Sequence, residues 1–244
     1  MENKEIRLNK YLSDAGVCSR RQADILIEEK RVTINGIIAA TGQKVSPLDR
    51  VAVNGKPVTL QEERVLLLVN KPRGIVCTAE KREKNNIIKY LNYPIRITYA
   101  GRLDKDSEGL LLMTNDGELI NKMMRARNCH EKEYLVKVNK PITGAFLKGM
   151  SEGVPILDTV TRPCSVEQTG KYTFRIILTQ GLNRQIRRMC EYFHYEVQTL
   201  KRIRIMNLKL GDLPVGKTRP LTAQEQQELY AQLNSADDSS ASFS

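Results

Sequence analysis

The chain reads Gly101-Arg102-Leu103-Asp104-Lys105-Asp106-Ser107-Glu108-Gly109, followed at once by the apolar run Leu110-Leu111-Leu112-Met113 and by Thr114-Asn115-Asp116-Gly117. Glycines bracket the acidic segment, and the apolar run after it predicts a buried strand. Asp104 lies between two cations, Arg102 and Lys105, which favour its ionised form. The stretch is therefore typical of a carboxylate that is held on a tight loop between two strands.

Several roles are open to Asp104 on local sequence alone. Asp106, Glu108 and Asp116 lie nearby, so a magnesium site is possible by the number of carboxylates. Arg102 and Lys105 would compete with a bound cation, whereas an ionised carboxylate between cations suits a nucleophile. A carboxylate that only caps Ser107 or the following turn explains the segment about as well.

Composition predicts a globular protein. The chain has 244 residues, of which 41% are hydrophobic and 27% charged. No apolar run approaches the roughly 18 residues of a membrane span, and the charged N-terminus is not typical of a signal peptide, so we expect a cytoplasmic protein. The five cysteines are scattered, which predicts reduced thiols and neither a disulfide framework nor a zinc site.

Positive charge is concentrated in one segment. The net charge is +11, and residues 171–209 carry nine lysines and arginines against two glutamates. Such a block indicates a polyanionic partner, and nucleic acid is the usual polyanion of the cytoplasm. A solvated basic face is the alternative explanation.

The chain predicts two domains. Residues 5–58 contain one helical pattern near 6–16, a second helix capped by Ser19 with Gln22 three residues later, and strands that enter Asn35-Gly36 and Asn54-Gly55 turns. Residues 59–64 are the predicted linker. We place domain boundaries at 1–60 and 65–234, with a disordered tail at 235–244.

The second domain mixes strand and helix patterns. Strands are predicted over 65–69, 110–113, 134–138 and 172–178, with partly extended structure over 196–205. Helices are predicted over 85–91, 116–125 and 184–193. The predicted fold class is α+β: a small N-terminal α/β domain and a larger domain with a mostly antiparallel sheet.

Two further segments carry candidate site residues. Arg184 and Arg187 are three residues apart on a predicted helix and share a face, so an anion is expected opposite them. That anion could be an RNA phosphate or the Asp104 carboxylate, and a solvated face is again the alternative. Tyr134 is either an ordinary sheet aromatic or a platform for an unpaired base.

The N-terminal residues resemble a known RNA-binding domain. Arg7-Leu8-Asn9-Lys10-Tyr11-Leu12, Cys18-Ser19-Arg20-Arg21-Gln22-Ala23 and Val32-Thr33-Ile34-Asn35-Gly36 are similar to the alpha-L domain first seen in a small-subunit ribosomal protein. The resemblance implies that Lys10, Arg20, Arg21 and Lys30 contact phosphates. Such contacts position a protein on RNA without reading its sequence.

The remaining motifs resemble those of one enzyme family. Lys71-Pro72-Arg73-Gly74, the segment from Gly101 to Gly117, Lys132-Glu133-Tyr134-Leu135-Val136 and the segment from Gly181 to Met189 occur in the order and spacing of the RsuA-like pseudouridine synthases. Together with the alpha-L domain, the resemblance covers almost all of residues 5–222. Residues 130–136 and 182–185 look closest to the RluF branch, which acts on large-subunit ribosomal RNA.

The resemblance implies a role for each site residue. Asp104 is the catalytic aspartate, acting as nucleophile at the sugar, although the first covalent step stays open. Arg187 pairs with Asp104, and Tyr134 packs on the uracil and assists proton removal from carbon 5. Arg102 fills the space that the flipped nucleotide leaves. The remaining RNA- or base-binding candidates are Arg184, Leu200, Lys10, Arg20 and Arg21.

The resemblance implies an RNA pseudouridine synthase, an isomerase that needs no metal, nucleotide or redox cofactor. The expected partner is 23S ribosomal RNA, with transfer RNA as an additional candidate; we expect a monomer and no membrane partner. A non-enzymatic RNA-binding or ribosome-assembly factor is the main competing function. An RNA methyltransferase would need a Gly-rich cofactor loop after a strand, and the sequence has none.

Overall fold

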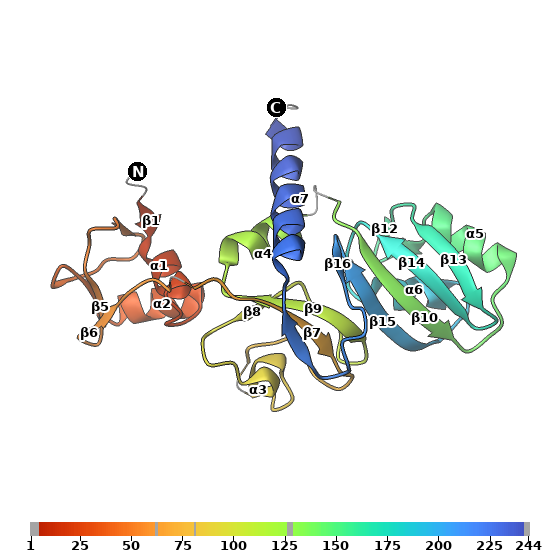
Figure 1. Ribbon diagram of the computed structural model, residues 1–244, viewed down its shortest axis with the longest axis horizontal. Helices are drawn as coiled ribbons and strands as arrows, with labels where there is room; N and C mark the ends of the chain where they lie inside the picture. The colour runs from red at the N-terminus through yellow and green to blue at the C-terminus, as the bar shows by residue number, and fades with distance from the viewer. Residues whose placement is uncertain (1–4, 62, 81, 126–128, 242–244) are drawn as a thin grey trace. The chain divides into compact units, whose positions relative to one another are not determined.

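The computed structural model describes residues 5–61, 63–80, 82–125 and 129–241 (Figure 1). The chain forms two compact units. Unit 1 comprises Met1–Val65, Tyr93–Thr98 and Thr114–Gly117; unit 2 comprises Leu66–Asn92, Tyr99–Met113 and Glu118–Ser244. Within the described ranges, no helix is both long enough and apolar enough to cross a membrane.

Unit 1 contains the two helices that the sequence predicts. Helix α1 spans Leu8–Asp14 and helix α2 spans Arg20–Glu28. The Ser19 hydroxyl accepts a hydrogen bond from the Gln22 backbone N–H at 3.2 Å, so Ser19 is the N-cap of α2, as predicted. Both helices pack on one cluster of buried apolar side chains with the strands of the unit.

Two hairpins complete unit 1, as the paired Asn-Gly sequences predict. Strand β2 (Val32–Ile34) pairs with β3 (Ile37–Ile38) and with β5 (Val51–Val53), which pairs with β6 (Lys56–Val58). Asn35-Gly36 and Asn54-Gly55 have positive φ angles at both residues, which a type I′ turn requires. A separate pair joins β1 (Ile6–Arg7) to β4 (Lys44–Val45).

Unit 2 is built on one mixed sheet, which confirms the predicted α+β class. Its strand order is β13-β14-β10-β15-β9-β7-β17, with β16 beside β15 and β8 beside β9. Most of its strand pairs are antiparallel, and β15 pairs with β9 in parallel. The strands span Leu66–Lys71 (β7), Thr98–Ala100 (β8), Glu108–Thr114 (β9), Lys132–Val138 (β10), Ser165–Gly170 (β13), Thr173–Leu178 (β14), Val197–Ile205 (β15), Leu208–Lys209 (β16) and Thr218–Pro220 (β17).

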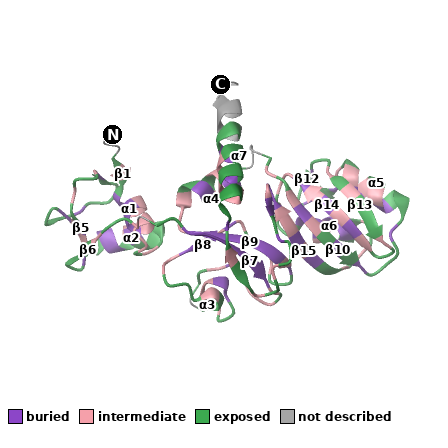
Figure 2. Ribbon diagram, viewed as in Figure 1, coloured by how far each residue is buried: buried purple, intermediate pink, exposed green. Residues whose placement is uncertain are grey.

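Strand β15 (Val197–Ile205) occupies nearly the whole segment that was predicted to be partly extended, and it joins two apolar cores. One core contains side chains of β7, β9, helix α4 (Gly117–Met124) and helix α7 (Ala223–Ala241), and it includes Ile205. The other contains side chains of β10, β14, helix α5 (Gly144–Glu152) and helix α6 (Gln185–Tyr192), and it includes Leu200. Figure 2 shows β7 and β9 as the buried strands of the first core.

Helices α3, α4 and α6 lie where helices are predicted. Helix α3 spans Ile87–Leu91, and the side chain of its N-cap Asn86 accepts a hydrogen bond from the Lys89 N–H. Helix α6 begins at Gln185, because Arg184 before it has a left-handed backbone conformation. The α6 prediction is therefore correct in type but begins one residue too early.

Some elements lie where none is predicted. Helix α5 follows the N-cap Thr143, whose hydroxyl accepts a hydrogen bond from the Phe146 N–H. A short hairpin of β11 (Pro155–Ile156) and β12 (Thr159–Val160) follows α5.

Helix α7 starts with a capping box in which Thr222 and Glu225 each accept a hydrogen bond from the other's backbone N–H. It continues through residues 235–241, where a disordered tail is expected. No glycine or proline interrupts that segment. Residues 242–244 lie outside the described ranges.

Candidate active site

Asp104 lies on a loop between β8 and β9, as the bracketing glycines predict. The loop is held from both sides: the Ser107 N–H donates to the Asp104 carbonyl at 3.1 Å, and the Gly74 N–H donates to the Lys105 carbonyl at 2.8 Å. The Asp104 side chain is half-buried. No side chain or backbone group in the described part of the chain forms a hydrogen bond or ion pair with its carboxylate, which is therefore available to a substrate.

The Asp104 loop forms one wall of a cavity in unit 2 with a volume of about 460 Å³. The cavity collects residues from distant parts of the sequence: Tyr134 and Lys132 from β10, Leu200 and Arg202 from β15, and the segment before α6. It thus brings together five of the predicted site residues, which are Asp104, Tyr134, Arg102, Arg184 and Leu200.

A buried lysine supports this loop from behind. Lys71 at the end of β7 is 0% exposed, and its Nζ donates to the carbonyls of Pro72 at 2.9 Å and Ile75 at 2.8 Å. These bonds close the turn whose Gly74 N–H holds Lys105. Burial lowers the pKa of Lys71, while nearby Cys77 and Asp104 act to raise it. The sequence motif contains Lys71, but no role for it was predicted.

Arg187 does not form the predicted direct pair with Asp104. Its two terminal nitrogens donate to the Val197 carbonyl at 3.2 Å and to the Asp106 carbonyl at 3.1 Å, and its buried Nε has no hydrogen-bond partner within the described part of the chain. Burial, and then the charge of Arg184, lower the pKa of Arg187, while the charges of Asp106 and Asp104 act to raise it. Arg187 thus binds the backbone of the Asp104 loop and not the Asp104 carboxylate.

Arg102 and Arg184 are both exposed at the cavity, where cations could meet RNA phosphates. The Arg184 guanidinium lies 3.9 Å from the Asp106 carboxylate, a weak and exposed ion pair. Leu200 is buried and lines the same cavity. The RNA and base contacts of these three residues stay predictions.

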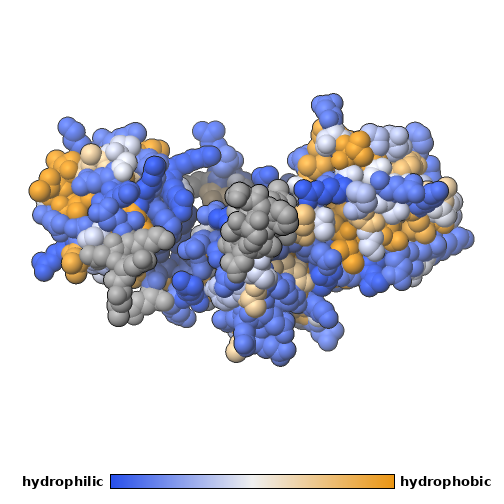
Figure 3. All heavy atoms as spheres, turned by 90° about the horizontal axis from the view of Figure 1, so that it is seen from above, coloured by the Kyte–Doolittle hydropathy of each residue, from blue (hydrophilic) through white to orange (hydrophobic). Residues whose placement is uncertain are grey.

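The predicted phosphate contacts of the N-terminal domain lie in unit 1. Arg20 and Arg21 are exposed on the first turn of α2. Lys10 forms an ion pair with Asp14 one turn along α1, which uses part of its donor capacity. The surface of unit 1 is not only hydrophilic, as Figure 3 shows, since Ile37, Ile38 and Leu48 are also exposed.

The acidic residues near Asp104 do not assemble a metal site. Across the described ranges, no group of three or more histidine, cysteine, aspartate or glutamate side chains is placed to hold a metal ion. The five cysteines are free thiols.

Comparisons with known proteins match the N-terminal and the C-terminal parts of the chain to two different family models. Residues 65–192 match the family model described as RNA pseudouridylate synthase, and residues 6–51 match the S4 domain. The chain is 52% identical over 232 residues to the dual-specificity RNA pseudouridine synthase RluF of Escherichia coli (strain K12), covering 94% of this chain and 80% of that protein.

Two further matches extend the similarity. The chain is 38% identical to the ribosomal large subunit pseudouridine synthase B of Bacillus subtilis (strain 168), covering 92% of this chain and 96% of that protein. A crystal structure of a pseudouridylate synthase matches with a TM-score of 0.69 and 29% identity, covering 92% of this chain and 99% of that one.

Proposed function

The chain belongs to the RNA pseudouridylate synthase family, and we propose that it isomerises a uridine of 23S ribosomal RNA with Asp104 as its nucleophile. The predicted family, RluF branch and enzyme class are confirmed: the protein is an RNA pseudouridine synthase with an S4 domain. Family membership rules out the competing functions, a non-enzymatic RNA-binding factor and an RNA methyltransferase.

One observation carries the assignment of Asp104: its carboxylate lies in the cavity without a partner among the described residues. In the proposed reaction a carboxylate oxygen attacks C1′ of the ribose, and the C1′–N1 bond breaks with its electron pair going to the uracil. The base then turns, its C5 bonds to C1′, and the carboxylate is released. A proton leaves C5 and a proton is gained at N1, so the product is an isomer of the substrate.

The other cavity residues have roles that their positions support. Tyr134 packs on the uracil and assists removal of the C5 proton, and Leu200 covers the base from another side. Arg102, exposed beside Asp104, fills the space that the flipped nucleotide leaves. Arg184 binds a phosphate at the cavity, and Arg187 holds the Asp104 loop through the Asp106 carbonyl.

The choice of RNA follows from the relatives. One relative is named for the ribosomal large subunit, and RluF is named as a dual-specificity enzyme. Transfer RNA stays the second candidate, as the sequence resemblance implies. A ribosomal RNA substrate also supports a cytoplasmic location.

Tritium release tests the choice of RNA. Purified protein is incubated with transcripts of 23S RNA, 16S RNA and transfer RNA that carry tritium at carbon 5 of uridine. We expect release from 23S RNA, because loss of the C5 proton accompanies each conversion. Release from transfer RNA or 16S RNA alone would contradict the proposed substrate, while leaving the enzyme class intact.

Replacing the arginine pair of α2 is expected to weaken RNA binding and its dependence on salt. Each lost phosphate contact reduces the slope of log K against log [salt] by roughly 0.7–0.9, so Arg20→Ala with Arg21→Ala should reduce it by roughly 1.4–1.8. Filter binding at several salt concentrations measures the slope.

Lys44→Ala with Lys56→Ala is the matched control for this binding measurement, because both lysines are exposed on strands of unit 1. This variant removes the same charge from elsewhere in the unit. If both double variants have equal slopes, the α2 pair does not contact phosphate specifically.

A further inference from the structure

Arg202 is a buried cation with an unused donor. It is 2% exposed on β15, where its Nε donates to the Leu110 carbonyl at 2.8 Å and its Nη1 to the Arg102 carbonyl at 3.4 Å. Its Nη2 is buried and has no hydrogen-bond partner among the described residues. A buried donor without an acceptor destabilises the protein, so a ligand that supplies an acceptor would recover the lost interaction.

The neighbours of Arg202 show where such an acceptor would lie. Tyr134 on β10 is directly opposite Arg202 on β15, and side chains in such pairs are about 5 Å apart at Cβ. Lys132 is two residues from Tyr134, so it lies on the same face of the sheet. All three residues line the cavity that contains Asp104. A base packed on Tyr134 would therefore lie beside both cations.

The Lys132 ammonium group also has few hydrogen-bond acceptors around it. Its Nζ donates to the His130 carbonyl at 3.1 Å, and an ammonium has three donors. Burial, and then the charge of Arg202, lower the pKa of Lys132. Among the described lining residues, Asp104 is the sole acidic side chain, against five lysines and arginines. Apart from Asp104, the described lining residues thus offer these cations no anion.

The reaction supplies that anion. When the C1′–N1 bond breaks, the uracil leaves with the electron pair, and the negative charge is shared by N1 and the carbonyl oxygens O2 and O4. This holds whether Asp104 attacks C1′ or the sugar first loses a proton. Cationic donors that are already in place at such a charge stabilise the transition state more than the ground state.

We propose that Arg202 and Lys132 donate hydrogen bonds to the departing uracil and stabilise its negative charge. The inference rests on the proposed reaction but not on the choice of RNA. It assigns Arg202 two functions: its Nε and Nη1 join β9 to the Arg102 carbonyl, two residues before Asp104, and its Nη2 contacts the base. Lys132 supplies the second cation from the neighbouring strand.

A better leaving group separates this role from a structural one. The test compares RNA that carries uridine with RNA that carries 5-fluorouridine at the position that the wild-type protein modifies. Fluorine withdraws electrons and stabilises the departing base, so less help from the protein is needed. Single-turnover consumption of the target nucleotide, at saturating enzyme, is measured by nuclease digestion and chromatography.

Arg202→Gln is expected to slow consumption of uridine by about 10²–10³-fold, the usual effect of removing one donor to a developing anion. Its loss on 5-fluorouridine should be at least about tenfold smaller. Lys132→Gln should show the same pattern, and because Lys132 is only half-buried, it carries the test if Arg202→Gln does not fold. Equal losses on both substrates, in whichever variant folds, would overturn the inference.

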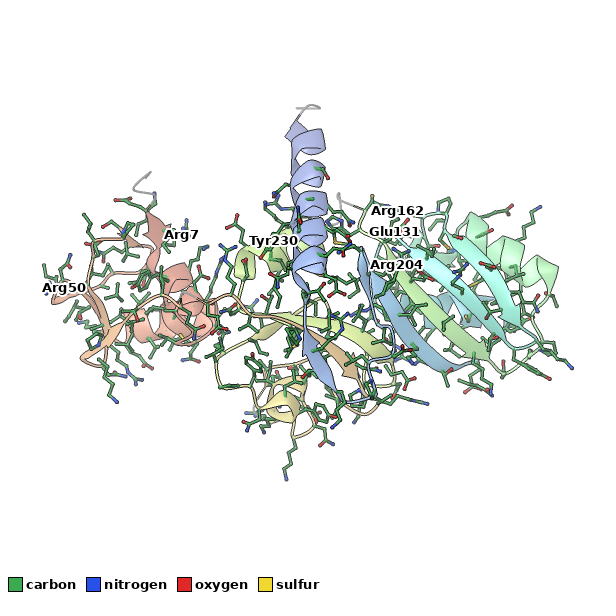
Figure 4. All side chains as sticks on the ribbon, viewed as in Figure 1. Arg7, Arg50, Glu131, Arg162, Arg204 and Tyr230 are labelled. Atoms are coloured by element: carbon green, nitrogen blue, oxygen red, sulfur yellow. The ribbon has the colours of Figure 1, made fainter. Side chains whose placement is uncertain are left out.

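Arg204→Gln is the matched control on the same strand. The Arg204 guanidinium donates to Glu133 at 2.6 Å and to Glu131 at 2.9 Å, and Figure 4 shows Arg204 beside Glu131. Arg204 does not line the cavity. We expect this variant to keep the wild-type ratio of the two rates. A failure of the Asp104 assignment would appear separately, as an active Asp104→Asn enzyme.

Discussion

Asp104→Asn is expected to slow tritium release from carbon-5-labelled uridine by on the order of 10⁴-fold or more, as the loss of a reacting group does in other enzymes. An amide oxygen is a poor nucleophile and carries no charge, so it cannot form the proposed bond to C1′. The fold should not suffer, because the carboxylate forms no hydrogen bond or ion pair within the described ranges. Tritium release at saturating RNA, with thermal unfolding measured in parallel, tests both statements.

Asp106→Asn is the control for the Asp104 variant. Asp106 is exposed two residues away on the same loop, and among the residues that the structure describes its carboxylate forms only the weak pair with Arg184 at 3.9 Å. The substitution removes the same charge, while the Asp106 carbonyl still accepts the hydrogen bond from Arg187. We expect a rate within a few fold of wild type. An Asp104→Asn enzyme that releases tritium as fast as Asp106→Asn would show that the nucleophile is another group.

Local sequence patterns predicted most elements of this fold. The Ser19 cap and the Asn-Gly turns depend on hydrogen bonds and φ angles within a few residues, so they can be read from the chain directly. The Asp104 loop was predicted for the same reason, since its bracketing glycines and the following apolar run are adjacent in sequence. Helix α5 was missed because Gly144 and Gly149 lie within it, and glycine has a low helix propensity.

The parts of the site that depend on pairing between distant strands could not be predicted. Arg202 belongs to a basic segment that was expected to be partly extended. The sequence therefore indicated its positive charge but not the direction of its side chain. Its inward orientation follows from the register of β15 with β10, where it faces Tyr134. The same limit explains Arg187: helical spacing placed it beside Arg184, but its partners, the Val197 and Asp106 carbonyls, come from other elements.

The second large effect is expected from Gly109→Ala, where β9 pairs in parallel with Arg202 of β15. Gly109 has a φ angle of +105°, and an added Cβ would lie 2.2 Å from the Arg202 carbonyl oxygen and 2.8 Å from the Arg202 nitrogen. Both atoms belong to the backbone, so the strands must separate. We expect the free energy of unfolding to fall by about 3–5 kcal/mol, the range of severe core substitutions. Urea denaturation followed by far-UV circular dichroism measures the loss.

Gly211→Ala separates the steric clash from backbone strain, because Gly211 has a φ angle of +55° with nothing within 4 Å of an added Cβ. It should cost only about 1 kcal/mol, the penalty of a left-handed conformation. Separating β9 from β15 also moves the Leu110 carbonyl away from Arg202. Gly109→Ala should therefore reduce tritium release even at temperatures at which the variant is still folded. Equal stability losses in the two variants would mean that β9 and β15 can separate at little cost, and that their close contact does not hold Arg202 and the Asp104 loop together.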